Sequence, residues 1–322
     1  IRPNFEEGGK LHAFKSVYDG FETFLYVPNE TSKSGTSIHD AIDSKRIMSL
    51  VVLSLVPAML FGMYNIGYQN ALADGKLADA TCWGMFLYGM LALLPKILVS
   101  YIVGLGIEFA WAQWKGEEIQ EGYLVSGILI PLIIPVTTPL WILVLAVAFA
   151  VIFTKEIFGG TGMNIFNVAL AARAFLFFSY PAAMSGDSVW VRLGSTFGLG
   201  GAEKAVDGFS GATPLGQIAA AKGILPDIHN TLGGPLTDWD AFLGFLPGSV
   251  GEVSTLAILI GACILIYTGI ASYKIMVSGV VGVFAMATVF NAIGATPAMQ
   301  VSALHHLIYG GFAFGIVFMA TD

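Results

Sequence analysis

Four polar features interrupt the long apolar runs of this chain, and each carries side chains able to do chemistry. Glu108, in "VGLGIEFAW", and Arg173, in "AARAFLFF", are charges inside apolar runs. "FGGTGMNIFN" sets three glycines before Asn164 and Asn167. "DGFSGATPLG" holds Thr213 between an alanine and a proline. What these groups do depends on the elements that position them.

The charged residues need partners, because a charge inside a membrane span costs about 2.5–3.5 kcal/mol unless it is paired or hydrated. Glu108 indicates either a cation or quinone-headgroup site or a carboxylate that snorkels to the interface. Arg173 requires a carboxylate, a phosphate or backbone carbonyls, and we favour a structural or cofactor-contacting partner. Asp322 follows an apolar run and either caps a span or faces a cavity. Glu252 fits a capping box with Ser249 at the start of a span.

The glycine–asparagine segment indicates a break at a helix start. Asn164 and Asn167, at i and i+3, are expected to share one helix face. Irregular backbone at membrane depth survives only where it lines protein or a cavity. Free amide N–H groups and two carboxamides suit a polar ring such as an isoalloxazine, and a glycine cluster for helix packing is the alternative.

The segment around Thr213 has turn chemistry. Asp, Gly and Ser form turns, and a residue before proline is biased to extended backbone. A threonine hydroxyl is a poor nucleophile without a base, and no histidine lies nearby in the sequence. The residues alone therefore favour a turn over a site.

Composition indicates an all-α, polytopic helical membrane protein. Of the 322 residues, 56% are hydrophobic and only 11% are charged, whereas a soluble domain carries about 25% charged residues. A membrane β-barrel would show alternating segments of about ten residues, and these are absent. Cys82 and Cys263 form no metal or disulfide motif, so we predict that they pack in the core. His305 and His306 are interpreted as interfacial residues.

About eight spans are expected, and they divide the chain into four parts. Residues 1–46 form a cytoplasmic N-terminal segment, 47–180 the first membrane half, 181–250 an outer-side polar loop, and 251–322 a second membrane half. The second span is expected as a tilted helix preceded by a turn around Pro95 and Lys96. A faint echo between the halves suggests an inverted repeat. The predicted spans are 47–68, 83–114, 123–135, 139–153, 165–180, 253–272, 275–293 and 303–320.

Basic residues give the orientation, because cytoplasmic loops carry an excess of Lys and Arg. The N-terminal segment holds six of them and is assigned to the cytoplasm. Alternation then places Lys115, Lys155 and Lys274 inside, and the loop with Thr213 outside.

"DGFSGAT", ending in Thr213, resembles the flavinylation signature of the Nqr and Rnf membrane subunits. In that family a flavin transferase attaches FMN to the threonine hydroxyl through a phosphoester. "FGGTGMNIFNVALAARAFLFFSYPAAMSGD", "PGSVGEVSTLA" and "GGFAFGIVFMATD" are also similar to the B subunits of sodium-translocating NADH:quinone reductases, in order over almost the whole chain. The long N-terminal segment and "EEGGK" favour that branch over the Rnf one.

The resemblance implies a set of site residues. Thr213 would bear covalent FMN, and Asp207, Ser210, Gly211 and Ala212 would form its recognition context. Riboflavin, non-covalent, is expected near Asn164 and Asn167, with Arg173 also counted as cofactor-binding. Ubiquinone or menaquinone is assigned to Gly104, Glu108, Phe175 and Phe177, and Na⁺ to Glu108 and Asp322. No catalytic residue and no other metal site is predicted.

The implied function is electron transfer from covalent FMN to riboflavin to quinone, coupled to Na⁺ translocation across the bacterial inner membrane. The chain would be inactive alone and would work in a six-subunit complex within the lipid bilayer, with no nucleic-acid partner. The alternatives are an Rnf-type ferredoxin:NAD ion-pumping subunit, or a secondary transporter or channel without redox chemistry.

This sequence departs from the family pattern in several places. Val168 follows Asn167 where the family has proline, and Leu105 replaces the second glycine near Glu108. "STFGLGGAEK" lengthens the loop before Thr213. The family continues past "ATD" for about two further spans, making about ten, so we expect this chain to be a fragment.

Overall fold

Two long helices that cross closely organise the fold. They are α2 (Ser44–Ala73) and α3 (Cys82–Lys115). Thr81 caps the start of α3 by accepting a hydrogen bond from the Gly84 N–H, and Gly116 ends the helix in the left-handed conformation. The structure is a computed structural model, and it describes residues 18, 34–36, 44–116, 122–196, 199–200 and 205–321.

Glycines allow α2 and α3 to touch through their backbones. A Cβ on Gly67 would lie 2.0 Å from the Met85 carbonyl oxygen, and one on Gly89 would lie 1.7 Å from the Met63 carbonyl oxygen. The two contacts are reciprocal, since each glycine stands four residues after the methionine that the other glycine faces. Small residues of this kind let helices in membranes approach closely, where dispersion contacts rather than water exclusion hold them together.

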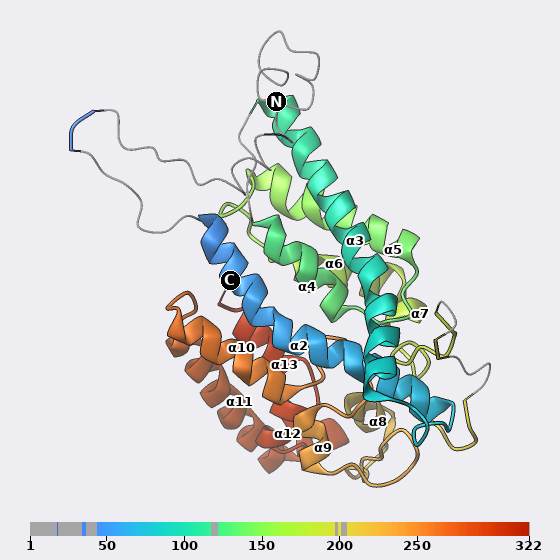
Figure 1. Ribbon diagram of the computed structural model, residues 1–322. Helices are drawn as coiled ribbons and strands as arrows, with labels where there is room; N and C mark the ends of the chain where they lie inside the picture. The colour runs from blue at the N-terminus through green and yellow to red at the C-terminus, as the bar shows by residue number, and fades with distance from the viewer. Residues whose placement is uncertain are drawn as a thin grey trace.

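The remaining helices form two groups on either side of α2 (Figure 1). α2 contacts α3 and α4 on one side and α10 of the second group on the other. The first group is α4 (Tyr123–Ile133), α5 (Leu140–Ala150), η3 (Val151–Lys155), η4 (Glu156–Phe158) and α6 (Val168–Ser179). The second is α10 (Thr255–Tyr267), α11 (Tyr273–Ile293), η5 (Pro297–Gln300), α12 (Ala303–Ile308) and α13 (Phe312–Phe318). Along the chain the groups are joined by α7 (Pro181–Met184), α8 (Pro214–Ala220) and α9 (Asp238–Leu243); α7 contacts α6, and α9 contacts α10 and α12.

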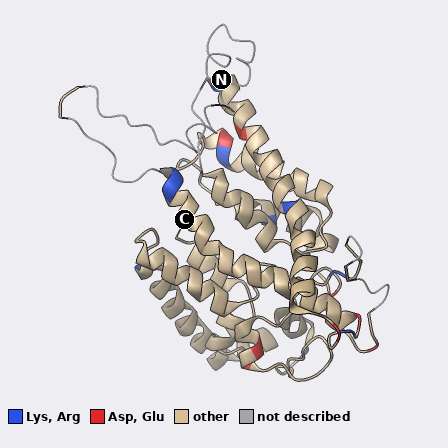
Figure 2. Cartoon of the chain, in the orientation of Figure 1, with Lys and Arg blue, Asp and Glu red and all other residues tan. Residues whose placement is uncertain are grey.

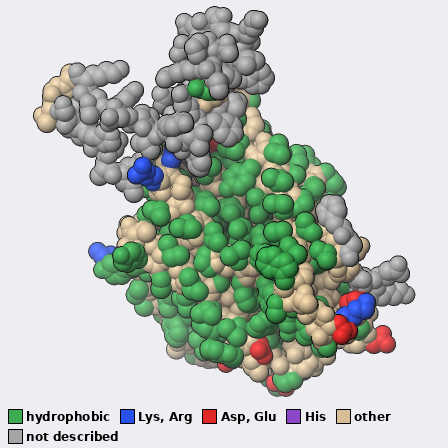
Figure 3. All heavy atoms as spheres, in the orientation of Figure 1, with side chains coloured by type: hydrophobic (Ala, Val, Ile, Leu, Met, Phe, Trp, Pro, Cys, Tyr) green, Lys and Arg blue, Asp and Glu red, His purple; other side chains and the backbone are tan. Residues whose placement is uncertain are grey.

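The surface confirms a helical membrane protein. Within the described part of the chain, four helices are long and apolar enough to cross a bilayer, over 45–73, 82–115, 140–158 and 273–293, and three shorter apolar helices accompany them. Charged residues are sparse along the helices and gather towards the ends of the molecule (Figure 2). Hydrophobic side chains cover most of the visible face between those ends (Figure 3), as lipid contact requires.

Buried asparagines of α2 hold the long polar loop against the helices. Asn65 Nδ2 donates to the Leu246 carbonyl at 2.9 Å, and Asn70 Nδ2 donates to the Arg192 carbonyl at 2.8 Å. Tyr88 on α3 adds a bond to the Gly194 carbonyl. A buried amide without a partner would cost about 1–3 kcal/mol, so these bonds fix where the loop leaves and rejoins the bundle.

Three expectations from the sequence are wrong. α3 runs unbroken through Pro95, because a transmembrane helix tolerates proline when neighbouring groups satisfy the freed carbonyl. The span predicted at 303–320 is interrupted between α12 and α13, where Gly310 and Gly311 pack against Leu215 and the Glu252 carboxylate. Cys82 and Cys263 are exposed rather than packed in the core.

Some expectations fall on residues outside the described part of the chain. They are nearly all of the cytoplasmic segment 1–46 and Asp322. The number of membrane crossings, the domain limits and the inverted repeat stay predictions.

We expect Gly89→Leu to break the helix crossing. A side chain there meets the Met63 carbonyl, so the helices must separate at a cost of about 1–3 kcal/mol. The matched control is Gly106→Leu on the same helix, where a Cβ meets nothing within 4 Å. Thermal unfolding in detergent should show a large loss of stability for Gly89→Leu and almost none for Gly106→Leu. Equal losses of stability would contradict the close contact of α2 and α3 at Gly89.

Candidate functional site

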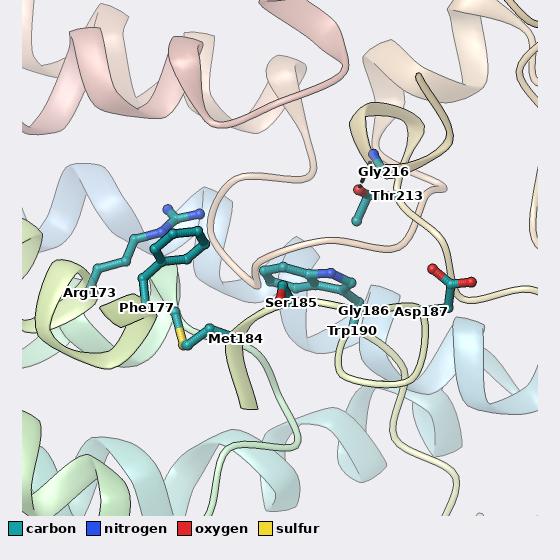
Figure 4. A pocket seen from close by; sticks show the side chains of 9 residues that line it. All are labelled: Arg173, Phe177, Met184, Ser185, Gly186, Asp187, Trp190, Thr213 and Gly216. Atoms are coloured by element: carbon teal, nitrogen blue, oxygen red, sulfur yellow. Dashed lines mark hydrogen bonds between the residues drawn. The ribbon is translucent and has the colours of Figure 1, made fainter. Parts of the chain in front are cut away.

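A cavity of about 260 Å³ lies where the polar loop meets the membrane helices. Its walls come from α6, from the end of α7 and the segment after it, and from the start of α8. In Figure 4 the Trp190 indole lies between Thr213 on one side and Arg173 with Phe177 on the other. The lining residues are Arg173, Phe177, Met184, Ser185, Gly186, Asp187, Trp190, Thr213 and Gly216.

Thr213 reaches this cavity because it caps α8. Its backbone is extended, as expected before Pro214, and its Oγ1 accepts a hydrogen bond from the Gly216 N–H at 3.0 Å. The side chain is half-buried. The predicted turn is therefore present, and it presents the hydroxyl at the edge of a cavity. No described base stands in contact with Oγ1, so the hydroxyl is not activated from within the described residues.

The residues before Thr213 hold its loop in place. Gly211 packs on the backbone of the cavity wall, since a Cβ there would lie 2.1 Å from the Asp187 carbonyl oxygen. Ser210 donates its N–H to the Thr231 carbonyl and accepts the Ala212 N–H on Oγ. Asp207 is exposed and away from the cavity lining. These contacts give Gly211 and Ser210 a positioning role.

The Gln217 side chain ties the same loop to the segment around His229. Its Nε2 donates to the carbonyls of Ala212 and His229, at 3.3 and 2.8 Å. Its Oε1 accepts the His229 N–H at 2.9 Å. The backbone on both sides of Thr213 is thus tied to the neighbouring segment.

Arg173 finds its partner in Glu252. The Nη1–Oε1 distance is 2.5 Å, with side-chain exposures of 33% for Arg173 and 11% for Glu252. The predicted capping box is wrong, because Ser254 rather than Ser249 caps α10 and Ser249 Oγ instead donates to the Ile133 carbonyl. Ser254 caps α10, so Glu252 is not needed at the helix end, and it joins the segment before α10 to α6.

The two phenylalanines of α6 face different surroundings. Phe175 stacks on Phe149, with ring centroids 4.6 Å apart. Phe177 is 53% exposed and lines the cavity. Two residues apart on a helix, they point in different directions, and only Phe177 lies with Thr213.

The glycine–asparagine segment is irregular, as expected, with left-handed backbone at Gly159, Gly160 and Gly162. Asn164 accepts the Gly162 N–H and donates to the Phe166 carbonyl, while Asn167 caps α6 by accepting the Leu170 N–H. The expectation that they share a helix face is wrong, since both precede the helix.

Glu108 is buried and paired with Lys155 of η3. Its side chain is 4% exposed, which excludes the snorkelling interpretation. Gly104, one turn earlier on the same buried face, packs against the Tyr123 ring. Neither residue is among those that line the Thr213 cavity.

Comparison with known proteins places these features in a family. The model of the NQR2, RnfD, RnfE family matches residues 31–322. The chain belongs to this family. It is 44% identical to the B subunit of the Na(+)-translocating NADH-quinone reductase of Chromohalobacter salexigens, covering 100% of this chain and 79% of the relative. The subunits of the same name from Klebsiella pneumoniae and Neisseria meningitidis are each 42% identical, covering 100% of this chain and 82% and 81% of theirs.

Several residues at the cavity and beside the buried charges could not be predicted from the sequence. Trp190 and Asp187 lie in a polar loop without periodic pattern, so only the folded loop brings them to Thr213. The sequence alone puts Lys155 in a cytoplasmic loop and Glu252 in a helix cap. The sequence did indicate that such partners exist, because Glu108 and Arg173 each need a counter-charge. Lys155 supplies it for Glu108, and Glu252 supplies it for Arg173.

We expect Arg173→Met and Glu252→Gln each to lower the free energy of unfolding by about 2–3 kcal/mol, because each leaves a partly buried charge or acceptor unpaired. The double variant should lose less than the sum, since the unpaired group is gone as well. Thermal or denaturant unfolding of the purified protein in detergent measures all three. If the losses of unfolding free energy in the two single variants add up to that of the double variant, the ion pair does not couple α6 to the segment before α10.

Proposed function

We propose that this chain is the B-type membrane subunit of a Na⁺-translocating NADH:quinone reductase, acting with the other subunits of that complex. The relatives that carry this name match the chain over its whole length. The helical membrane fold and the ionisable residues buried within it agree with a role in moving charge across a bilayer. The chain is an oxidoreductase component and is not active alone.

We assign the covalent FMN to Thr213. The observation that carries this assignment is the place of the half-buried Thr213 hydroxyl at a cavity shared with Trp190 and Arg173. An aromatic indole offers a stacking surface for a planar ring, and a guanidinium offers donors and charge to phosphate or to ring oxygens. The residues present therefore fit a flavin joined to Thr213 through its phosphate.

A flavin at this site supplies the redox chemistry, and the protein supplies position and electrostatics. Gly211 and Gln217 fix the backbone that carries Thr213. Glu252 holds Arg173 at the cavity wall. The open hydroxyl, with no described base beside it, agrees with attachment by a separate flavin transferase.

The remaining assignments rest on the family resemblance. We assign Glu108 and Asp322 to the Na⁺ pathway, and quinone to Gly104, Glu108, Phe175 and Phe177. Riboflavin near Asn164 and Asn167 has no geometric support, since Asn164 and the Asn167 oxygen are engaged by backbone groups.

The two proposed sites lie at opposite ends of the molecule. Figure 1 shows α8, which follows Thr213, near one end and the C-terminal part of α3, which carries Glu108, towards the other. With the basic-residue rule, this arrangement supports Thr213 on the periplasmic side of the inner membrane and Glu108 towards the cytoplasm.

We expect Thr213→Ala to abolish covalent flavin. When the complex is expressed with its flavin transferase, the denatured wild-type chain should fluoresce on a gel and carry the added mass of one FMN. Thr213→Ala should lose both signals and nearly all quinone reductase activity, while Thr213→Ser, which keeps a hydroxyl, should retain part of the label. Covalent flavin on the alanine variant, or none on the wild type, would overturn the assignment.

Gly211→Ala tests whether the packing of the loop matters. The added methyl meets the Asp187 carbonyl, so the loop must move and the yield of FMN on Thr213 should fall several-fold. Gly194→Ala is the matched control, because a Cβ there meets nothing within 4 Å. Intact mass of both variants gives the labelled fraction, and full labelling of Gly211→Ala would show that the loop position is not needed for attachment.

A further inference from the structure

The ion pair of Glu108 and Lys155 is almost fully enclosed. Their side chains are 4% and 3% exposed, and Lys155 Nζ contacts Glu108 Oε1. The second carboxylate oxygen, Oε2, is buried and has no hydrogen-bond partner among the described residues. Half of the acceptor capacity of a buried carboxylate is therefore unused, which costs free energy unless another group fills it.

The backbone loses its regularity at the same point. α5 ends at Ala150, the five residues of η3 that finish at Lys155 are π-helical, and η4 (Glu156–Phe158) is a 3₁₀ turn followed by Gly159 in the left-handed conformation. π-helical turns are rare and occur frequently at functional sites. Interrupted helices that expose backbone carbonyls are also the usual setting of Na⁺ sites at membrane depth. This break is a backbone feature, distinct from the side-chain contact, and it places Lys155 at the end of the π-helical turn.

One further buried carboxylate, that of Glu156, acts electrostatically on Glu108. Among the described residues no group of three or more His, Cys, Asp or Glu side chains could hold a metal ion. The Lys155 ammonium already occupies Oε1 of the Glu108 carboxylate and offsets its charge. A Na⁺ ion held by both oxygens of Glu108 would have to displace the ammonium, because two cations on one carboxylate repel each other in a low-dielectric interior.

We propose that Lys155 is a tethered cation that occupies the Glu108 carboxylate when Na⁺ is absent, and that Na⁺ and the Lys155 ammonium compete for it. This inference rests on the proposed function, in which Na⁺ passes Glu108. Lys155 thereby keeps the carboxylate charge-balanced between transport events and sets how tightly Na⁺ binds. The flexible four-carbon stem of lysine lets the ammonium withdraw without a change of fold, which a short or rigid cation would not allow.

The test is the Na⁺ dependence of NADH:quinone reductase activity in the assembled complex. In Lys155→Gln the competitor is gone, so the half-saturating Na⁺ concentration should fall by about tenfold or more. In Lys155→Arg the side chain stays charged and can bind the carboxylate in a bidentate manner, so the half-saturating Na⁺ concentration should rise. A purely structural lysine would change assembly or maximal rate and leave both concentrations at the wild-type value.

Two controls separate this inference from the proposed function. FMN content and subunit composition show that each variant is assembled, and if Lys155→Gln fails to assemble, the direction of the Lys155→Arg shift decides alone. A wild-type complex without Na⁺-stimulated activity would overturn the proposed function. A Na⁺-dependent wild type with an unchanged half-saturating concentration in the assembled variants would overturn the role of Lys155 only.

Discussion

The ion pair of Arg173 and Glu252 is the interaction on which the arrangement of the site depends. A guanidinium inside an apolar helix requires a counter-charge, and none is available nearby on α6 itself. The counter-charge comes from the start of the second half, 79 residues later in the chain. Satisfying it brings α6, the segment before α10 and the loop between them together, and the cavity with Thr213 opens at that junction.

The same constraint operates at the other buried charge. Glu108 and Lys155 neutralise each other across α3 and η3, yet one carboxylate oxygen stays without a partner among the described residues. The first pair is partly exposed and shapes a cavity. The second is enclosed and lies at a helix break. The Arg173–Glu252 pair holds structure in place. In the Glu108–Lys155 pair one carboxylate oxygen has no partner among the described residues, and a mobile cation can bind there.

Close backbone contacts decide how rigidly these groups are held. Gly67 and Gly89 let α2 and α3 touch, and the buried asparagines of α2 then fasten the long loop to the crossing. Gly211 plays the corresponding part for the Thr213 segment. Because hydrophobic exclusion gives little specificity between helices in lipid, such contacts and buried hydrogen bonds carry the precise positions.

The sequence by itself determined the membrane class, the break at the glycine–asparagine segment and the turn around Thr213, because composition, left-handed glycines and Thr-Pro chemistry are local. It also showed that Glu108 and Arg173 need partners. Only the tertiary structure decided which residues those partners are, because Lys155 and Glu252 are distant along the chain. The local sequence indicated a loop lysine at Lys155 and a helix cap at Glu252. The cavity was likewise invisible, because Trp190 and Thr213 meet only once the loop is anchored on α2.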